Sequence, residues 1–93
     1  MFVQLTNPEI RINPARILYI MHETVYLEGD REVDIEPEDI ARFSNLVELA
    51  EDDDDENQPI WVNPDNVTFI QEKWVFLSDG TELQVTSIDP LVG

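Results

Sequence analysis

One segment of the chain occurs twice, and this internal repeat constrains the fold more than any other feature of the sequence. A shift of fifty positions, without a gap, lays residues 10–35 on residues 60–85. Both copies carry an Asn-Pro pair, and the other matched positions are mostly apolar: Ile17 with Val67, Tyr19 with Phe69, Ile20 with Ile70, Val25 with Val75, Tyr26 with Phe76 and Leu27 with Leu77. Because a segment of about forty residues buries too little surface alone, the copies are expected to share one core or to pair with another subunit.

Short apolar runs separated by turn residues predict strands in both copies. In the first copy and the segment before it, the expected strands cover residues 2–5, 10–12, 16–21, 25–27 and 33–35. Asn13-Pro14 suits the start of a type I turn, in which Asn caps the turn and Pro presets the next dihedral angle. Gly29-Asp30 fits a two-residue type II′ hairpin, and Asp79-Gly80 is typical of a type I′ hairpin.

One helix is expected between the copies, over about residues 37–50. Pro37 suits the first helical position, and Glu38 and Asp39 are favourable at the positive end of the helix dipole. The buried stripe of this helix would consist of apolar residues at helical spacing: Ile40, Phe43, Leu46, Val47 and Ala50. Residues 51–57 are mostly acidic and repel one another, which predicts a solvated linker.

These elements predict a mainly β fold with one helix, of the α+β class. We expect two tandem β meanders that pack as one small sandwich or barrel-like domain with approximate two-fold symmetry. The domain spans residues 1–93, with the first repeat at 9–36 and the second at 59–86.

The chain is strongly acidic, since 21 Asp and Glu residues against five Lys and Arg residues give a formal net charge of -16. Such a surface repels phosphate backbones and anionic membranes, so neither direct nucleic-acid binding nor membrane binding is expected. The expected partner is a basic protein. A salt-rich cytoplasm would select the same surplus of acids, and this alternative stays open.

The sequence contains no cysteine, which excludes disulfides, thiolate catalysis and cysteine metal sites. The first residues lack the pattern of a signal peptide, and no apolar stretch approaches the roughly 20 residues that span a bilayer. We therefore expect a soluble, cytoplasmic protein.

No motif for catalysis, a cofactor or a metal is recognisable. His22 is the only histidine and lies at the end of a predicted strand, where a turn residue is the simplest interpretation. The acids at 52–55 lack the alternating ligands and the Gly of a calcium loop. The sequence therefore predicts a protein that is not an enzyme and holds no cofactor or metal.

Acids recur at every second position in one stretch: Glu28, Asp30, Glu32, Asp34 and Glu36. Because alternate residues of a strand share a face, these carboxylates are expected to line one surface, while Val33 and Ile35 hold the other face in the core. This acid stripe is either the solvated face of a half-buried strand or a docking surface for a basic partner.

Aromatic residues provide a second candidate surface. Trp74 and Phe76 share one face of a strand that is apolar on both sides, so both faces are expected to be covered, one by the helix and the other by another subunit. The aromatic residues form either an ordinary two-layer core or a partner pocket. Tyr26 is expected beside them. Trp61 adds to the apolar surface that must be hidden.

The first copy combines an Asn before two spaced isoleucines with a Gly-centred hairpin and a trailing helix: Asn13, Ile17, Ile20 and Gly29. This pattern resembles the FlbD/SwrD flagellar and swarming family, whose members are short β-rich proteins. The second copy is similar, and it also resembles the closing part of LytTR DNA-binding domains. The first resemblance implies a role in motility, whereas DNA binding conflicts with the charge.

We expect a small acidic, non-enzymatic interaction or regulatory module that binds a basic protein partner, with a homodimer as a possible assembly. The candidate partner-binding residues are Glu28, Asp30, Glu32, Asp34, Glu36, Trp61, Trp74 and Phe76. Two alternatives stay open. One is a phage-type anti-defence inhibitor whose acids imitate nucleic acid, and the other is a flagellar or swarming accessory protein.

Overall fold

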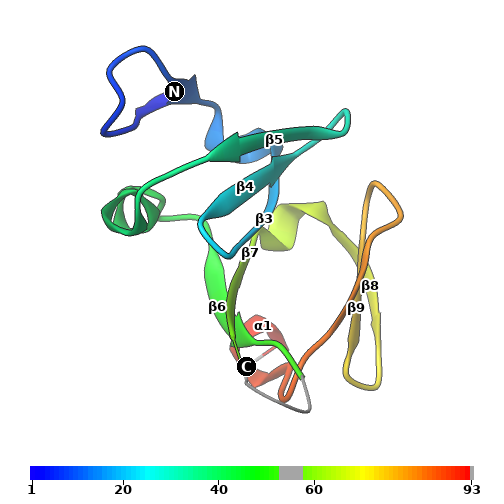
Figure 1. Cartoon of the computed structure of the whole chain (residues 1–93). Helices are drawn as coiled ribbons and strands as arrows, with labels where there is room; N and C mark the ends of the chain where they lie inside the picture. The colour runs from blue at the N-terminus through cyan, green and yellow to red at the C-terminus, as the bar shows by residue number, and fades with distance from the viewer. Residues whose placement is uncertain (53–57, 93) are drawn as a thin grey trace.

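The computed structural model describes residues 1–52 and 58–92 of the chain (Figure 1). Most of its elements are short strands: β1 (Val3–Gln4), β2 (Arg11–Ile12), β3 (Ile17–Met21), β4 (Thr24–Leu27), β5 (Arg31–Asp34), β6 (Val47–Ala50), β7 (Pro59–Val62), β8 (Val67–Gln71), β9 (Trp74–Leu77) and β10 (Glu82–Gln84). The described helices are the 3-10 helices η1 (Pro14–Arg16), η2 (Pro37–Arg42) and η3 (Pro64–Asn66) and the α-helix α1 (Asp89–Val92). The predicted mainly β fold is confirmed.

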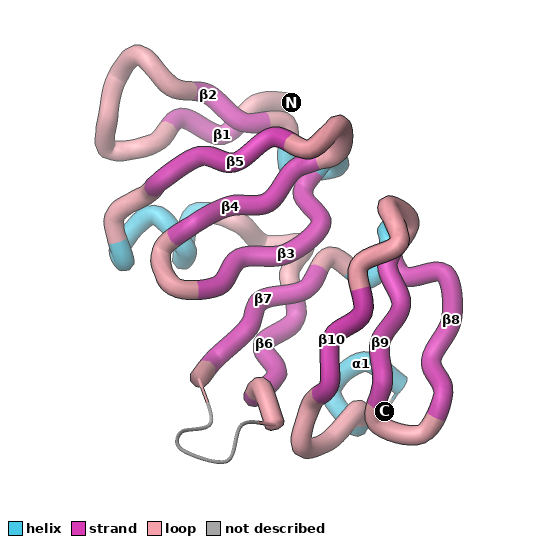
Figure 2. Tube along the Cα trace, turned by 45° about the vertical axis from the view of Figure 1, so that its right-hand side comes forward, coloured by secondary structure: helices cyan, strands magenta, loops and turns pink. Residues whose placement is uncertain are grey.

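The strands form three antiparallel sheets (Figure 2). The largest has the order β5-β4-β3-β7-β6, so β7 from the second half of the chain pairs directly with β3 from the first half. The other two are β10-β9-β8 and the hairpin β1-β2. Among the described strands, β2 pairs only with β1, and β8 pairs only with β9. Thus β7 pairs with β3, but the matching strands β2 and β8 do not pair with each other.

The elements of the second half follow those of the first at the offset seen in the sequence. β8 and β9 begin and end fifty residues after β3 and β4, and η3 lies fifty residues after η1. The register also recurs, because Ile20 pairs with Val25 as Ile70 pairs with Val75. The bulge in β3 returns in β8.

The turn predicted at Asn13-Pro14 forms, and it continues into a 3-10 helix, as does the matched segment at Asn63-Pro64. The Oδ1 atom of Asn13 accepts a hydrogen bond from the amide of Ala15 at 3.1 Å. Asn63 Oδ1 accepts one from the amide of Asp65 at the same distance. Proline takes the first helical position after each asparagine, where a missing N–H costs nothing.

The turn predicted at Gly29-Asp30 is wrong in type. Leu27 pairs with Arg31, so the loop has three residues and not two. Gly29 and Asp30 both have positive φ angles, 82° and 60°, whereas a type II′ turn requires a positive φ only at its first central residue.

The type I′ prediction at Asp79-Gly80 is also wrong. Gly80 has a φ of 93°, but Asp79 is not among the described residues with positive φ. The Gly80 amide donates to the Leu77 carbonyl at 3.0 Å, and the Leu77 amide donates to the Thr81 carbonyl at 2.8 Å. These bonds are typical of a type I turn followed by a left-handed glycine.

The predicted helix over residues 37–50 is wrong beyond its first turns. It begins at Pro37 as expected, but η2 ends at Arg42, and residues 47–50 form β6. All four residues of β6 pair with β7, from Val47 with Val62 to Ala50 with Pro59. This ladder satisfies the backbone of β6, and such tertiary pairing overrides the weak helical preference of the segment.

The predicted linker at 51–57 lies partly outside the described residues, which do not include 53–57. Its first two residues are bonded into the fold. The Glu51 amide donates to the Gln58 carbonyl at 2.7 Å, and the Asp52 amide donates to the Gln84 carbonyl at 2.9 Å. The solvated spacer therefore cannot begin at Glu51.

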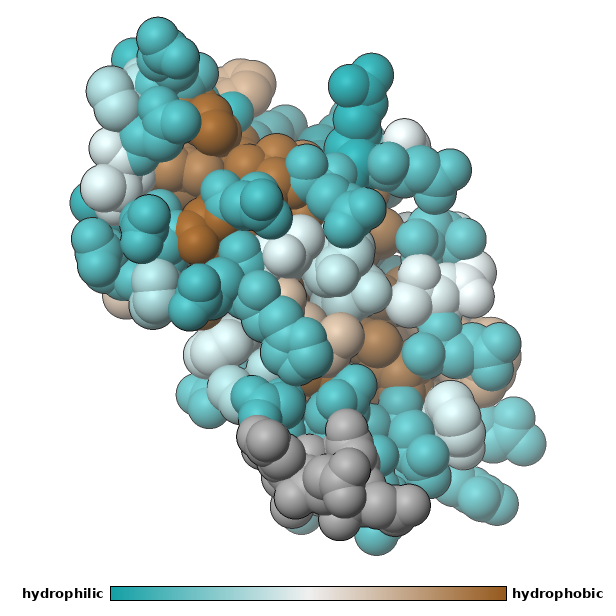
Figure 3. Space-filling model, viewed as in Figure 1, coloured by the Kyte–Doolittle hydropathy of each residue, from teal (hydrophilic) through white to brown (hydrophobic). Residues whose placement is uncertain are grey.

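The five-stranded sheet is buried on both faces near its centre. Ile60 and Val62 of β7 enter one apolar cluster, and Trp61 packs against the other. The first cluster joins the two larger sheets: Leu18, Tyr19, Leu49, Ile60, Val62, Val75, Leu77, Leu83 and Val85. The second lies between the five-stranded sheet and the segments around β1, β2 and η2: Leu5, Ile12, Ile17, Ile20, Val25, Ile35 and Phe43. Hydrophilic residues cover most of the surface shown in Figure 3.

Candidate functional site

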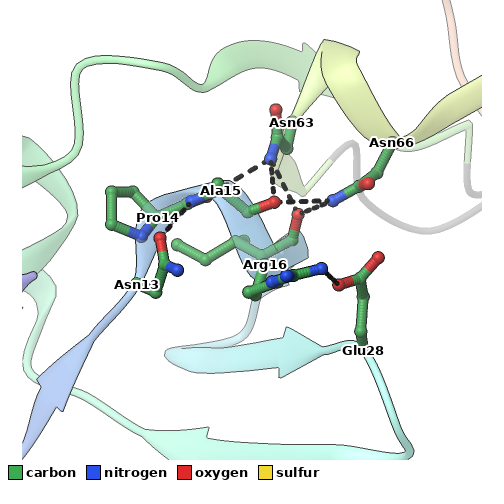
Figure 4. A network of polar contacts seen from close by, with 8 residues as sticks. Asn13, Pro14, Ala15, Arg16, Glu28, Asn63 and Asn66 are labelled. Atoms are coloured by element: carbon green, nitrogen blue, oxygen red, sulfur yellow. Dashed lines mark hydrogen bonds and ion pairs between the residues drawn. The ribbon is translucent and has the colours of Figure 1, made fainter. Parts of the chain in front are cut away.

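Two asparagines of the second half fasten it to η1 of the first half (Figure 4). Asn63 is fully buried, and its Nδ2 donates to the carbonyl of Ile17 at 3.0 Å and to that of Pro14 at 3.3 Å. Asn66 Nδ2 donates to the same Ile17 carbonyl at 2.7 Å. The Ile17 carbonyl, directly after the 3-10 turn, accepts from both side-chain amides, whereas the Pro14 carbonyl also accepts from the Ile17 amide and from Asn45 Nδ2 at 2.9 Å. The junction between the halves is therefore fixed by directional bonds as well as by the β3–β7 pairing.

An acidic depression of about 220 Å³ lies at this junction. It contains the stacked rings of Tyr19 and Tyr26, whose centroids are 4.5 Å apart at an interplanar angle of 16°. Acids from both halves of the chain line it, namely Asp30, Glu32 and Asp79, and Arg31 is the one base among the lining residues. We call the two tyrosines and the three acids the acidic seam.

The field of the seam acts on Tyr19. Burial of the hydroxyl, together with the neighbouring Tyr26 and the negative charges of Asp79, Glu32 and Glu51, raises the pKa of Tyr19 from 10.0 to about 12. The ring stays neutral at physiological pH. Burial disfavours any charge at the hydroxyl, whereas the negative charges of Asp79 and Glu32 favour a cation placed over the exposed side of the seam.

The acid stripe keeps its alternation only along β5. Glu32 and Asp34 are exposed on one face, while Val33 is half-buried and Ile35 is buried on the other. Asp34 is opposite Thr24, whose hydroxyl lies 3.4 Å from Asp34 Oδ1. Glu32 and Asp34 nevertheless line different depressions, Glu32 at the seam and Asp34 beside Thr6.

The ends of the stripe leave the strand. Glu28 forms an ion pair with Arg16 at 3.1 Å between Oε2 and Nη1, so its charge is partly neutralised within the chain. Asp30 lies in the three-residue loop. Glu36 is the N-cap residue of η2, where the chain has already turned away from β5. The five acids therefore do not form one continuous row.

Asp39 is a buried polar centre that the sequence analysis treated only as a helix-dipole residue. It is 1% exposed, and its Oδ1 accepts bonds from the Thr6 amide at 2.8 Å, the Thr6 hydroxyl at 2.7 Å and Arg42 Nε at 3.1 Å. Its Oδ2 accepts one from the Glu36 amide at 3.1 Å. Burial raises the pKa of Asp39, but the bonds from Thr6 and Glu36 and the charge of Arg42 together lower it by more than burial raises it. The pKa of Asp39 therefore lies below its ordinary value. Asp39 ties η2 to the segment after β1.

The aromatic candidates lie in separate places. Phe76 stacks on Phe69, with centroids 4.2 Å apart, and not beside Tyr26 as predicted. Trp74 is 37% exposed and Phe69 is 53% exposed, so the aromatic side of the β8–β9 hairpin is largely open to solvent. Trp61 is half-buried and lines a shallow depression with residues of η2 on the opposite side of the five-stranded sheet.

His22 lies exposed in the β3–β4 turn with a φ of 53°, in agreement with the turn interpretation. Within residues 1–52 and 58–92, no group of three or more His, Asp or Glu side chains has the arrangement of a metal site. The described helices are also too short to cross a bilayer.

Sequence reasoning missed Tyr19 and Asp79 as members of the seam, and Phe69 as an exposed ring. The repeat contained part of the signal, since Tyr19 and Phe69 occupy matched positions in the two copies. Comparisons of the chain with protein-family models, curated proteins and solved structures give no match.

Proposed function

We propose that the protein is a small non-enzymatic interaction module that binds a basic protein segment at the acidic seam. One observation carries the proposal, namely that Asp30 and Glu32 of the first half meet Asp79 of the second half around a stacked tyrosine pair. A lysine or arginine side chain of a partner would lie against the Tyr26 ring with its charged end among the three carboxylates. Cation–π contact at an exposed site contributes about 0.5–1 kcal/mol, so most of the selectivity for a basic partner comes from the carboxylates.

The net charge of -16 supports this role beyond the seam itself. A strongly negative surface accelerates encounter with a basic partner and has its largest effect at low salt. The exposed acids Asp34 and Glu36 extend the negative surface away from the seam toward Thr6. They contribute to the rate of association more than to the bound state.

We also propose that the fold arose as a tandem repeat of one β meander, since bounds, registers and Asn-Pro turns recur at an offset of fifty residues. A closed two-fold arrangement would require β8 to pair with β2 as β3 pairs with β7. Among the described strands β8 pairs only with β9 and β2 only with β1. We therefore favour an open arrangement, in which the second repeat adds to one side of the first and no strand pairing closes the circle. The seam is a product of this arrangement, because it needs side chains from both repeats.

The test uses a fluorescent lysine-rich peptide and fluorescence anisotropy at several salt concentrations. The seam variant carries Asp30→Asn, Glu32→Gln and Asp79→Asn. The matched control changes three exposed acids away from the seam, Glu9, Glu38 and Glu48, to Gln, and so has the same net charge.

We expect the seam variant to bind the peptide at least about tenfold more weakly than the control, a difference of about 1.4 kcal/mol. The control should lose only the long-range attraction that salt also removes. Equal losses in the two variants would contradict the proposal, because the peptide would then respond to net charge alone.

A further inference from the structure

Matched strands of the two repeats differ sharply in burial. In β3 the side chains of Leu18 and Ile20 are 2% and 0% exposed. The matched strand β8 is half-open, with Thr68 exposed and Phe69 53% exposed. The two strands have the same length and a bulge at the same position, and each pairs with the next strand of its own hairpin, β3 with β4 and β8 with β9. The difference therefore comes from what lies on their other side.

The other side of β3 is occupied by β7, whereas β8 is the edge of its sheet. In β8 the hairpin closes on the pair Gln71 and Trp74 across a two-residue turn. Backbone groups of an antiparallel strand alternate in direction, so the N–H and C=O of Ile70, one residue earlier, point away from β9 to the open edge. The matched residue Ile20 directs the same groups at Trp61 of β7.

The strand that matches β7 in the first repeat is β2, and its outer edge is open as well. Arg11 occupies the position of Trp61, and the β1–β2 hairpin corresponds to the β6–β7 hairpin that flanks β3. The Leu5 amide donates to the Ile10 carbonyl at 3.1 Å, so by alternation the backbone groups of Arg11 point away from β1. The chain thus exposes both halves of the contact that joins its own repeats.

We propose that a second copy of this chain docks its β2 antiparallel to β8, in the register of the β3–β7 pairing. Arg11 of the incoming copy would then lie opposite Ile70, as Trp61 lies opposite Ile20. Asn13 of that copy takes the position of Asn63 and turns its amide to the carbonyls of η3. Within its own chain Asn13 uses its Oδ1 in the same cap as Asn63, and no bond from its Nδ2 is among the contacts of the described residues.

The contact is head-to-tail, because β8 and the β1–β2 hairpin lie at opposite ends of the molecule (Figures 1 and 2). Each copy that joins presents a new β8, so addition continues until a ring closes or a fibre grows. The contact between the two repeats of one chain would then recur between the second repeat of one copy and the first repeat of the next.

Charge and apolar surface at the two ends fit self-association in spite of the acidic chain. Residues 67–77 contain one acid and one base, and residues 1–13 contain one acid and one base, so both ends are formally neutral in their side chains. Four of the five exposed large apolar residues of the described chain lie at these ends: Met1, Phe2, Phe69 and Trp74. An uncovered edge strand with aromatic side chains is the usual template for strand addition.

The test uses two full-length variants, each of which blocks one end. Ile70→Pro removes the outward N–H of β8, and Arg11→Pro removes the outward N–H of β2. Neither amide takes part in the ladder within the chain, so circular dichroism should show the native fold in both. Should Ile70→Pro lose that fold, Phe69→Lys blocks the same end by placing a charge on an already exposed position.

Sedimentation velocity at high salt, where the repulsion of the acidic surfaces is screened, gives the outcome. We expect the native chain to form species larger than a dimer and each variant to stay monomeric. An equimolar mixture of the two variants should form dimers and nothing larger, because one free β8 meets one free β2. A monomeric native chain at all concentrations would overturn the proposal.

A symmetric β8–β8 contact would give a different pattern, in which Arg11→Pro still dimerises and the mixture gains nothing. That result would also overturn the head-to-tail arrangement. Salt separates this inference from the proposed function. Self-association should strengthen as salt rises, whereas binding of the basic peptide at the seam should weaken.

Discussion

Replacing Asn63 with Ala should destabilise the fold more than the same replacement at Asn13. The two residues make the same cap, with Oδ1 3.1 Å from the amide two residues later. Loss of such a cap costs about 1 kcal/mol. Asn63 additionally donates its Nδ2 to the carbonyls of Pro14 and Ile17, and it is 0% exposed. At about 1 kcal/mol for each of these bonds, the total for Asn63→Ala is about 3 kcal/mol.

The assay is urea unfolding followed by circular dichroism, in dilute protein at low salt so that the chain is monomeric. The midpoints should fall in the order native, Asn13→Ala, Asn63→Ala, with unchanged slopes. Asn66 also donates to the Ile17 carbonyl, so Asn63→Ala and Asn66→Ala should be non-additive when combined. Equal effects of Asn13→Ala and Asn63→Ala would refute the reasoning, since the bonds between the repeats would then contribute nothing.

Three further predictions concern Asp39, Tyr19 and the exposed acids of the stripe. Asp39→Asn should cost roughly 3 kcal/mol of folding stability, because an amide cannot accept all the donors that surround the carboxylate. In the native chain the stabilisation by Asp39 is present above its ordinary pKa and is lost as the pH falls through its lowered pKa. Acid titration of the unfolding midpoint will report this loss. Tyr19 has a raised pKa, so the folding stability that its neutral hydroxyl provides is complete below pH 10 and is lost as the pH rises toward about 12. Over that range the melting temperature of Tyr19→Phe should fall less steeply than that of the native chain. Joint replacement of Glu32, Asp34 and Glu36 by Gln, Asn and Gln should change the free energy of unfolding by less than about 0.5 kcal/mol for each residue, as thermal melts at one salt concentration will show.

The repeat made the strands and the Asn-Pro turns predictable, because two sequences with the same spacing of apolar residues report the same local structure. The sequence did not predict β6. Val47 fits a helical stripe and a strand equally well, and only its pairing with Val62 of β7, more than ten residues later, decides between them. The turn types failed for a different reason, since they depend on how many residues the ladder leaves unpaired.

The candidate site was predictable only in part. The alternation along β5 followed from period two, but the seam needs Asp79 beside Asp30 and Glu32, and no local pattern relates residues so far apart. Asp39 escaped notice because its main partner, Thr6, lies 33 positions away in the chain. Tyr19 and Phe69 could not be distinguished by sequence, because their burial depends on whether β7 lies alongside.

The most direct test of this account is the rate of amide hydrogen exchange at Ile20 and Ile70 in the dilute monomer. The two residues are matched in sequence, strand position and hairpin pairing, and they differ in that β7 covers only the first. We predict slow exchange at Ile20, close to the rate set by global unfolding, and fast exchange at Ile70. Slow exchange at both amides in the monomer would contradict the open edge of β8. It would also contradict the arrangement in which β3 is paired on both sides and β8 on one side only.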